Sequence, residues 1–329
     1  MTAERASRVS LTGATGFVGR AVYSALVEAG YRVRCASRDP ARARARWPER
    51  EWVALDVDDA DTLGPALRGC DAALYLVHEM RGARGDYLER EAAAARRFGE
   101  AARREGLRRI VYLGGMLPSG PPSKHLASRL EAGRSLREAF AGTVEIRASM
   151  IVGAGSESWK IVRDLAVRLP AMVLPRWLSS RTQPVAIDDV VAALVCALKL
   201  DDSEVGVYDA PGPEVLTGRQ ILERIAHLRG TAPVLVSVPL LAPKLASYWI
   251  DFVTRADFEV ARELVVGLTS DIVAKNREIW GKMPGHRRKT FDEAAREALL
   301  ADAASLPAAT RRLEGMLRVL SRKSPPSRL

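Results

Sequence analysis

The chain has 329 residues, 47% of them hydrophobic, so it can bury a sizeable core in one large domain or in a domain with a smaller lobe. It contains no apolar run of the roughly eighteen residues that span a bilayer, and residues 1–8 lead into a strand without a signal-peptide core, so we expect no transmembrane segment and a cytoplasmic location. The formal net charge of +10 is nearly all arginine, spread among acidic residues without interleaved aromatics, which argues against a specific nucleic-acid site.

Residues 9–20 (VSLTGATGFVGR) carry the motif on which the rest of the prediction depends. They predict a short strand, a turn with three glycines and an amphipathic helix. In a dinucleotide-binding βα unit Gly13 allows the sharp turn, Gly16 lets a pyrophosphate approach the backbone, and Gly19 lets the helix lie close to the strand. The free N–H groups at the helix start would face the phosphates. We therefore expect the phosphates along Gly13, Ala14, Thr15, Gly16, Phe17, Val18 and Gly19.

The second strand, predicted at Tyr31–Ala36, ends where such folds read the adenosine ribose. An acidic side chain there accepts from the 2′-hydroxyl of NAD, whereas a basic one pairs with the 2′-phosphate of NADP. Ser37 stands in the place of the acid and Arg38 follows it, so we predict NADP(H) in preference to NAD(H), with NAD(H) possible. The alternatives are a solvated Arg38 and a ribose contact from Asp39, which otherwise caps the next helix.

The third strand, predicted at Trp52–Leu55, is followed by Asp56 and Val57, a corner that lies beside the adenine in such folds. Asp56 could accept from the adenine amine or cap its own turn. A helix is predicted from about residue 59 to residue 67.

The fourth strand is predicted at Asp71–His78 from an almost continuously apolar run, typical of a parallel strand that is covered on both faces. Because ligands bind at the carboxyl ends of such strands, we expect its last residues near the cofactor. These residues are Leu76, Val77 and His78.

A long helix is predicted at 86–105, then a fifth strand at Arg109–Leu113 that stops at Gly114 and Gly115. The two glycines would favour close approach of the backbone to the nicotinamide ribose. A helix at about 123–140 and a sixth strand at 143–151 follow.

Beyond Gly153 the βα rhythm breaks. We expect helices at 159–169 and after Asp188 or Asp189 as a cap, an apolar proline-broken stretch at 170–177, strands at 205–208 and 234–238, and a capping box at Thr217. Apolar helices are predicted at 239–268, and they favour packing over the substrate side of the cleft, with membrane association as the alternative. The predicted fold is α/β, a doubly wound parallel sheet with a smaller C-terminal α/β lobe. Its divisions are a dinucleotide-binding domain (1–153), a substrate or lid lobe interleaved with the sheet (154–320) and a disordered tail (321–329).

Cys35, Cys70 and Cys196 are odd in number, far apart and placed in or beside apolar segments. This pattern favours buried free thiols over a disulfide framework or a metal site, and we expect no metal.

With these elements placed, the chain resembles the extended and atypical branches of the short-chain dehydrogenase/reductase superfamily, whose fold is of the Rossmann type. TGATGFVG matches the superfamily's TGxxGxxG fingerprint, and QPVAIDDVV at 183–191 is similar to a stretch of its epimerase-like members. The segments YLVHEM, YLGGMLP, HLASRLEAG and RLPAMVLPRW resemble a bacterial group of NAD(P)-binding proteins. That group is related to the accessory NAD(P)H-binding subunit of respiratory complex I and to nitrogen-metabolite-repression-type regulators.

The resemblance implies a catalytic Ser or Thr after the fifth strand and a Tyr-x-x-x-Lys on the next helix, and the chain departs from both. Gly114 and Gly115 stand at the serine position, His125 at the tyrosine and Arg129 at the lysine. His125 can exchange a proton near neutral pH, and Arg129 can bind ribose hydroxyls or a phosphate but cannot act as the lysine's proton relay. His125 could also be an exposed helix residue. His78 could donate a proton, line the nicotinamide pocket or bond a backbone carbonyl.

These observations favour an NADPH-dependent reductase of a small apolar carbonyl or enone-like substrate, with His78, His125 and Arg129 as catalytic candidates. A second hypothesis is an NADP(H)-binding sensor or complex-assembly factor without turnover, which would have a protein partner. Epimerase or dehydratase chemistry on a nucleotide sugar is a third, disfavoured because it depends on the missing tyrosine.

Overall fold

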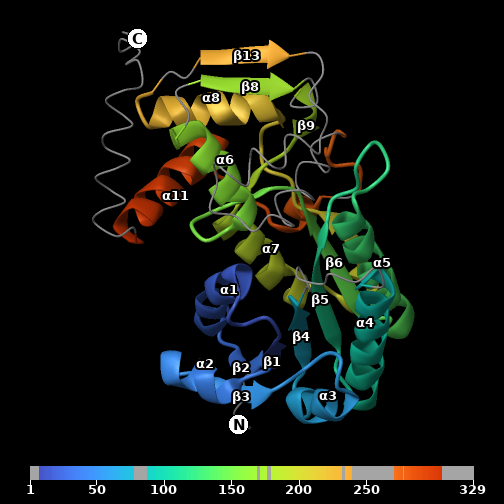
Figure 1. Cartoon of the computed structure of the whole chain (residues 1–329). Helices are drawn as coiled ribbons and strands as arrows, with labels where there is room; N and C mark the ends of the chain where they lie inside the picture. Colours follow the sequence, from blue (N-terminus) through green and yellow to red (C-terminus); the bar gives the residue numbers. More distant parts are fainter. Residues whose placement is uncertain are drawn as a thin grey trace.

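A seven-stranded parallel sheet forms the centre of the protein in the computed structural model, which describes residues 7–77, 87–168, 171–175, 179–231, 234–238, 270–276 and 278–305. The strand order is β11-β6-β5-β4-β1-β2-β3, so the direction of winding reverses between β1 and β4 (Figure 1). The strands are β1 (Arg8–Leu11), β2 (Arg32–Ser37), β3 (Glu51–Ala54), β4 (Ala72–Tyr75), β5 (Arg109–Gly115), β6 (Thr143–Ala148) and β11 (Gly206–Asp209). This doubly wound sheet confirms the predicted fold class.

Helices cover both faces of the sheet, which is why every residue of the central strands β4, β5 and β6 is buried. On one face α1 (Phe17–Glu28) packs against α7 (Ile187–Lys199), with Leu26 and Leu194 in one core cluster. On the other face α3 (Ala60–Leu67), α4 (Tyr87–Arg104) and α5 (Lys124–Ala139) enclose a second cluster that includes Phe98 and Leu136. The short α2 (Pro40–Arg46) joins β2 to β3.

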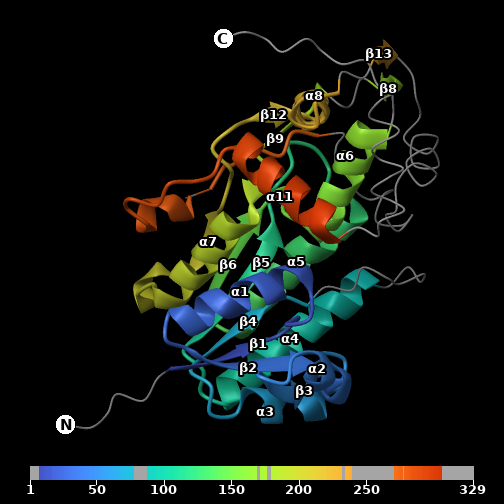
Figure 2. The ribbon, with the colours of Figure 1, turned by 90° about the vertical axis from the view of Figure 1, so that its left-hand side faces the viewer.

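The C-terminal lobe has a third core cluster, formed by residues such as Trp159, Ile221 and Phe291. Its helices are α6 (Glu157–Arg168), α8 (Gly218–Leu228) and α11 (Phe291–Ser305), which gather at one end of the sheet (Figure 2). Its strands form three pairs: β7 (Ile151–Val152) with β10 (Val185–Ala186), β8 (Ala171–Pro175) with β13 (Val234–Val238), and β9 (Arg181–Thr182) with β12 (Leu216–Thr217). Two short 3-10 helices, η2 (Asp202–Glu204) and η3 (Ile279–Lys282), complete the described elements.

Local signals at helix ends were predicted well, with one exception. Asp39 accepts from Arg42 N at 2.9 Å as the cap of α2, and Thr217 forms the expected capping box at the start of α8. The expected cap of α7 at Asp188 or Asp189 is wrong: the helix begins at Ile187, after Ala186, and both aspartates lie in its first turn.

Three strand boundaries also differ from the prediction. β4 ends at Tyr75, whereas the fourth strand was expected to continue through Leu76 and Val77. β5 does not stop at Leu113 but continues through Gly114 and Gly115, which pair in register with Arg147 and Ala148 of β6. The sixth strand ends at Ala148, and the chain then forms β7, which pairs with β10 of the lobe. The apolar proline-broken stretch at 170–177 contains β8.

Some predictions concern residues outside the described ranges, among them the helices expected at 239–268 and the tail from 321. Within the described residues no helix is long and apolar enough to cross a bilayer. Cys35 and Cys70 are buried free thiols, as expected, and Cys196 is a half-buried one.

Candidate functional site: a dinucleotide cleft at the start of α1

Each glycine of the β1–α1 turn occupies a place that a side chain would disturb. Gly13 has φ +64°, and a Cβ there would lie 2.6 Å from the Leu76 carbonyl oxygen. A Cβ on Gly19 would lie 2.2 Å from Gly13 O, so the start of α1 lies directly on the turn. At Gly16 a Cβ would meet only Gly13 O, at 3.2 Å, and this residue is exposed. The turn is therefore closed on its inner side and open where a phosphate would contact Gly16.

The start of α1 fits an anionic group. Gly16 is its N-cap, makes no side-chain capping bond, and is followed by a first turn without acidic residues. The first N–H groups of a helix have no intrahelical acceptor, and the positive end of the helix dipole adds to their attraction for anions. Thr15 is exposed beside them, and its carbonyl accepts a 3.0 Å hydrogen bond from the Arg20 guanidinium. These residues can hold a dinucleotide pyrophosphate.

Thr12, to which the sequence assigned no role, fixes the two strands at the reversal point. Its Oγ1 donates to Leu74 O at 3.0 Å and accepts from Leu76 N at 2.9 Å. These bonds hold the glycine turn against the end of β4, where Leu76 and Val77 are half-buried. His78, the next residue, lies outside the described ranges.

At the end of β2 the charged side chains differ in what they contact. Asp39 caps α2, and its N–H contacts Ser37 Oγ at 3.2 Å. Arg38 is exposed and has no hydrogen bond or ion pair with any residue that the structure describes. At this corner Arg38 is thus the side chain that can pair with a ligand phosphate.

The corner after β3 has its own internal bonds. Asp56 Oδ1 accepts from Asp58 N at 3.0 Å, as the turn-capping alternative predicted, and the Val57 carbonyl accepts from Arg97 at 3.1 Å. One Asp56 oxygen is therefore engaged within the turn.

Gly114 and Gly115 are buried inside β5. A Cβ on Gly114 would lie 2.6 Å from Glu145 Oε1, and one on Gly115 would lie 2.4 Å from Leu126 Cδ1. The space that these glycines leave is thus filled by side chains of β6 and α5. Glu145 is fully buried and forms ion pairs with Arg137 and with Arg147, whose Nε lies 2.7 Å away. No local sequence pattern indicates that these three charged residues meet.

His125 and Arg129 lie one turn apart on α5. Arg129 donates to Leu113 O at 2.9 Å, and its buried Nε has no hydrogen-bond partner among the described residues. Burial, reinforced by the Arg129 charge, lowers the pKa of His125 to about 4. The imidazole is therefore neutral at pH 7, which differs from the near-neutral titration expected from the sequence. His125 is half-buried, not an exposed helix residue.

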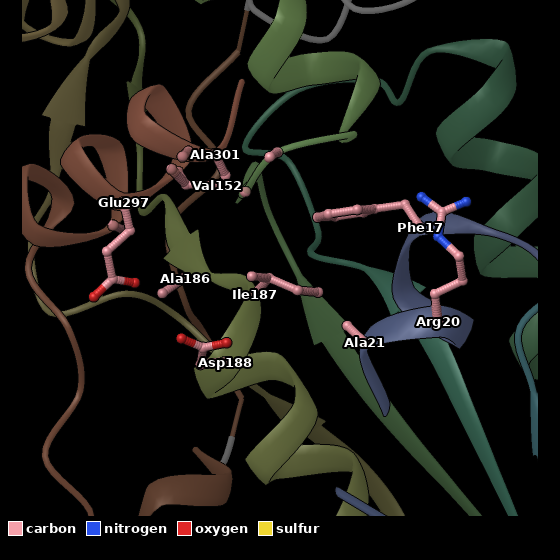
Figure 3. A pocket seen from close by; sticks show the side chains of 13 residues that line it. Phe17, Arg20, Ala21, Val152, Ala186, Ile187, Asp188, Glu297 and Ala301 are labelled. Carbon is pink, nitrogen blue, oxygen red and sulfur yellow. The ribbon is translucent and has the colours of Figure 1, made fainter. Parts of the chain in front are cut away.

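A groove of about 380 Å³ lies beside the turn (Figure 3). Phe17 and Arg20 of α1 form one side, the residues after β7 and at the start of α7 form its floor, and α11 forms the other side. Phe17 closes the end near β7, because a Cβ on Gly153 would lie 2.9 Å from its ring.

Comparisons with known proteins agree with this geometry. A family model described as NAD(P)H-binding matches residues 13–163. The chain is 27% identical over 249 residues to ceramide reductase of Caulobacter vibrioides, covering 73% of this chain and 78% of that one. It is 24% identical over 261 residues to the mitochondrial NADH dehydrogenase (ubiquinone) 1 alpha subcomplex subunit 9 of Arabidopsis thaliana, covering 74% and 63%.

Among solved structures, the triphenylmethane reductase of a Citrobacter species, complexed with NADP(H), has a TM-score of 0.66 at 15% identity, over 88% of this chain and 99% of that one. This likeness concerns the fold. The fold is of the Rossmann type, and the glycine turn has the geometry that such folds use to bind dinucleotides. Residues 13–163 match the NAD(P)H-binding family model, and the expected similarity to a complex I subunit is found beside the similarity to a reductase.

Proposed function

We propose that the protein is an NADPH-dependent reductase of a small, apolar carbonyl or enone-like substrate. The observation that carries the cofactor choice is the exposed Arg38 at the end of β2, beside an open glycine turn. The reductase activity is supported by the similarity to ceramide reductase. We also propose that the protein is located in the cytoplasm, as expected from the sequence.

The preference for NADPH is tested by Arg38→Ala. Arg38 would donate to the 2′-phosphate, a group that NADH lacks, so its loss should weaken NADPH binding by about 1.5 to 3 kcal/mol and leave NADH nearly unchanged. Fluorescence titration with both cofactors measures this difference. Arg219→Ala removes an exposed arginine of α8 and serves as the control. Equal losses of affinity for NADPH and NADH would contradict the assignment of Arg38 to the 2′-phosphate.

For the remaining cofactor contacts we propose the residues that the sequence predicts. The turn from Gly13 to Gly19 would hold the pyrophosphate, Asp56 and Val57 the adenine, and the ends of β4 and β5 the nicotinamide side. Bound NADPH supplies the hydride that reduces the substrate. Arg129 would use its unpartnered Nε for a ribose hydroxyl or phosphate oxygen, in the place of the family's lysine.

The proton chemistry of such a reductase differs from that of a tyrosine enzyme. A neutral His125 can donate an N–H hydrogen bond that polarises a substrate oxygen, but at pH 7 it holds no imidazolium proton to transfer. The proton would then come from His78 or from water. A carbonyl or enone suits this site, because its oxygen needs only polarisation while the hydride is delivered.

A specific observation favours a second candidate, an NADP(H)-binding sensor or assembly factor without turnover. Where the family places its lysine, the Arg129 guanidinium is bonded to the Leu113 carbonyl, and no described residue of α5 restores the Tyr-x-x-x-Lys pair. The similarity to a complex I subunit is consistent with such a role.

One experiment separates the two candidates. Purified protein is mixed with NADPH and a panel of aldehydes, enones and quinones, and absorbance at the nicotinamide band is followed. The reductase hypothesis predicts oxidation that falls by about a hundredfold in His78→Ala or His125→Gln. Tight NADPH binding without oxidation by any of these classes, and recovery of a bound protein partner, would support the sensor instead.

A further inference from the structure

The groove beside the dinucleotide turn has an apolar lining that no step of the proposed reduction uses. Its floor and walls are mainly small aliphatic side chains, and one aromatic ring closes one end. The apolar members are Phe17, Ala21, Val152, Ala154, Ala186, Ile187, Ala294, Ala298 and Ala301. A volume of about 380 Å³ lies within the range of small-molecule sites, and apolar surface facing water favours a ligand that covers it.

Three charged side chains border the groove, and they are divided between its two sides. Asp188 and Glu297 lie on the α7 and α11 side, and Lys289 bridges them, with its Nζ 2.5 Å from a carboxylate oxygen of each. The positive charge of Lys289 is thus already shared by two acids.

Arg20 lies on the α1 side with Phe17 (Figure 3). Its guanidinium donates to the Thr15 carbonyl at 3.0 Å, and no described carboxylate pairs with it. The side chain is exposed, so it keeps donors for another acceptor. The groove therefore has on one side a cation that no described carboxylate neutralises, acids on the other side and a mainly apolar lining between them.

We propose that this groove is a second ligand site, which binds an apolar carboxylate with its charged group on Arg20 and its alkyl chain along the alanine-rich lining. A guanidinium pairs well with a carboxylate, since its parallel donors match the two oxygens. The acids on the α7 and α11 side repel the same group, so charge alone fixes the direction in which the ligand lies. Nine of the thirteen lining residues present apolar side chains, which favours an alkyl chain over a polar sugar as the occupant.

Calorimetric titration with decanoate, below its micelle concentration and without cofactor, tests the proposal. The wild-type protein should bind one decanoate, and decanol, which has the chain without the charge, should bind about tenfold more weakly. Arg20→Ala should weaken the binding of decanoate by a similar factor, and Arg20→Lys should weaken its binding less because the positive charge remains. The titration does not require turnover, so it can fail or succeed independently of the proposed reductase activity.

Two variants of α11 test where the alkyl chain of decanoate lies. Ala301 is exposed and lines the groove, so Ala301→Phe should fill it and weaken decanoate about tenfold without disturbing the core. Leu300 is 68% exposed and is not part of the lining, so Leu300→Phe adds an aromatic ring to the same helix and should leave binding unchanged. NADPH affinity, measured in parallel, shows that each variant is folded.

Three results would overturn the proposal. The first is no heat of binding with the wild-type protein. The second is an equal loss of affinity for decanoate in Ala301→Phe and in Leu300→Phe. The third is an Arg20→Ala variant that weakens NADPH but not decanoate, which would assign the guanidinium to the cofactor's pyrophosphate.

Discussion

His125 and Arg129 lie one helical turn apart, and each restricts the chemistry of the other. The arginine is fixed by its bond to the Leu113 carbonyl, so its positive charge stays close to the imidazole. Burial disfavours the charged ring, and the neighbouring cation adds to this effect. A histidine in the tyrosine's place is thus a neutral hydrogen-bonding group, a property that the residue type alone did not reveal.

This pKa predicts a pH dependence of stability. In the unfolded chain His125 titrates near 6.5, and in the folded protein near 4, so between these values the unfolded state binds the extra proton. Stability from this residue is complete above pH 6.5 and is lost as the pH falls toward 4, by about 3 kcal/mol in total. Urea unfolding of the wild type and of His125→Gln at pH 7, 5.5 and 4.5 measures it.

The variant should lose less stability than the wild type over this range. His227→Gln removes an exposed histidine of α8 and serves as the control. If the free energy of unfolding fell equally with pH in the wild type and in His125→Gln, the pH dependence could not be assigned to His125.

At the scale of elements, the sequence predicted the features that depend on neighbouring residues but not those that depend on tertiary contacts. The β1–α1 turn and the caps at Asp39 and Thr217 depend on neighbours within a few residues, and the sequence located them correctly. The cap of α7 was misplaced because Asp189, which resembles a cap, instead accepts from Lys289 N at 3.0 Å and contacts His286. A partner a hundred residues away leaves no local pattern.

The end of β5 shows the same limit. Two adjacent glycines resemble a strand terminator, yet Gly114 continues the ladder because Glu145 of the next strand needs the space that a Cβ would fill. Glu145 in turn is buried only because Arg137 and Arg147 pair with it. Nothing in the order of residues shows that these three charges meet. The dinucleotide turn was therefore predictable, whereas the surroundings of His125 and of the groove required the structure.

For the whole molecule, much of the arginine excess serves internal contacts. Arg109 is fully buried and donates to Leu200 O and Asp202, while Arg163 pairs with Asp164 and Asp302 inside the lobe. Such arginines hold elements together, and because they pair with acids, they are not the source of the net charge of +10.

The sheet and the lobe share chain segments, although the division at residue 153 remains a prediction. β11 and α7 both follow that residue, yet β11 is a strand of the main sheet and α7 packs on α1. From β11, Asp209 holds the segment 270–276: its Oδ2 accepts from the backbone N–H groups of Lys275 and Asn276, at 2.9 Å each. The same segment contacts the loop after β5, where Ser119 N donates to Asp271 O at 2.7 Å. One buried carboxylate therefore links the edge of the sheet to the loop beside the cleft.

Asp209→Ala should accordingly destabilise the protein as a whole. The side chain is 1% exposed, and its removal takes away the acceptor that holds the N–H groups of Lys275 and Asn276 and leaves a cavity, at a cost of about 2 to 4 kcal/mol. The free energy of unfolding from urea titration at pH 7 measures this loss. Asp201→Ala removes an exposed carboxylate that makes no capping bond and should change stability by less than about 0.5 kcal/mol. If Asp209→Ala were no more destabilising than Asp201→Ala, the segment 270–276 would have to be held by its other contacts, to Arg181 and Gln183, rather than by this carboxylate.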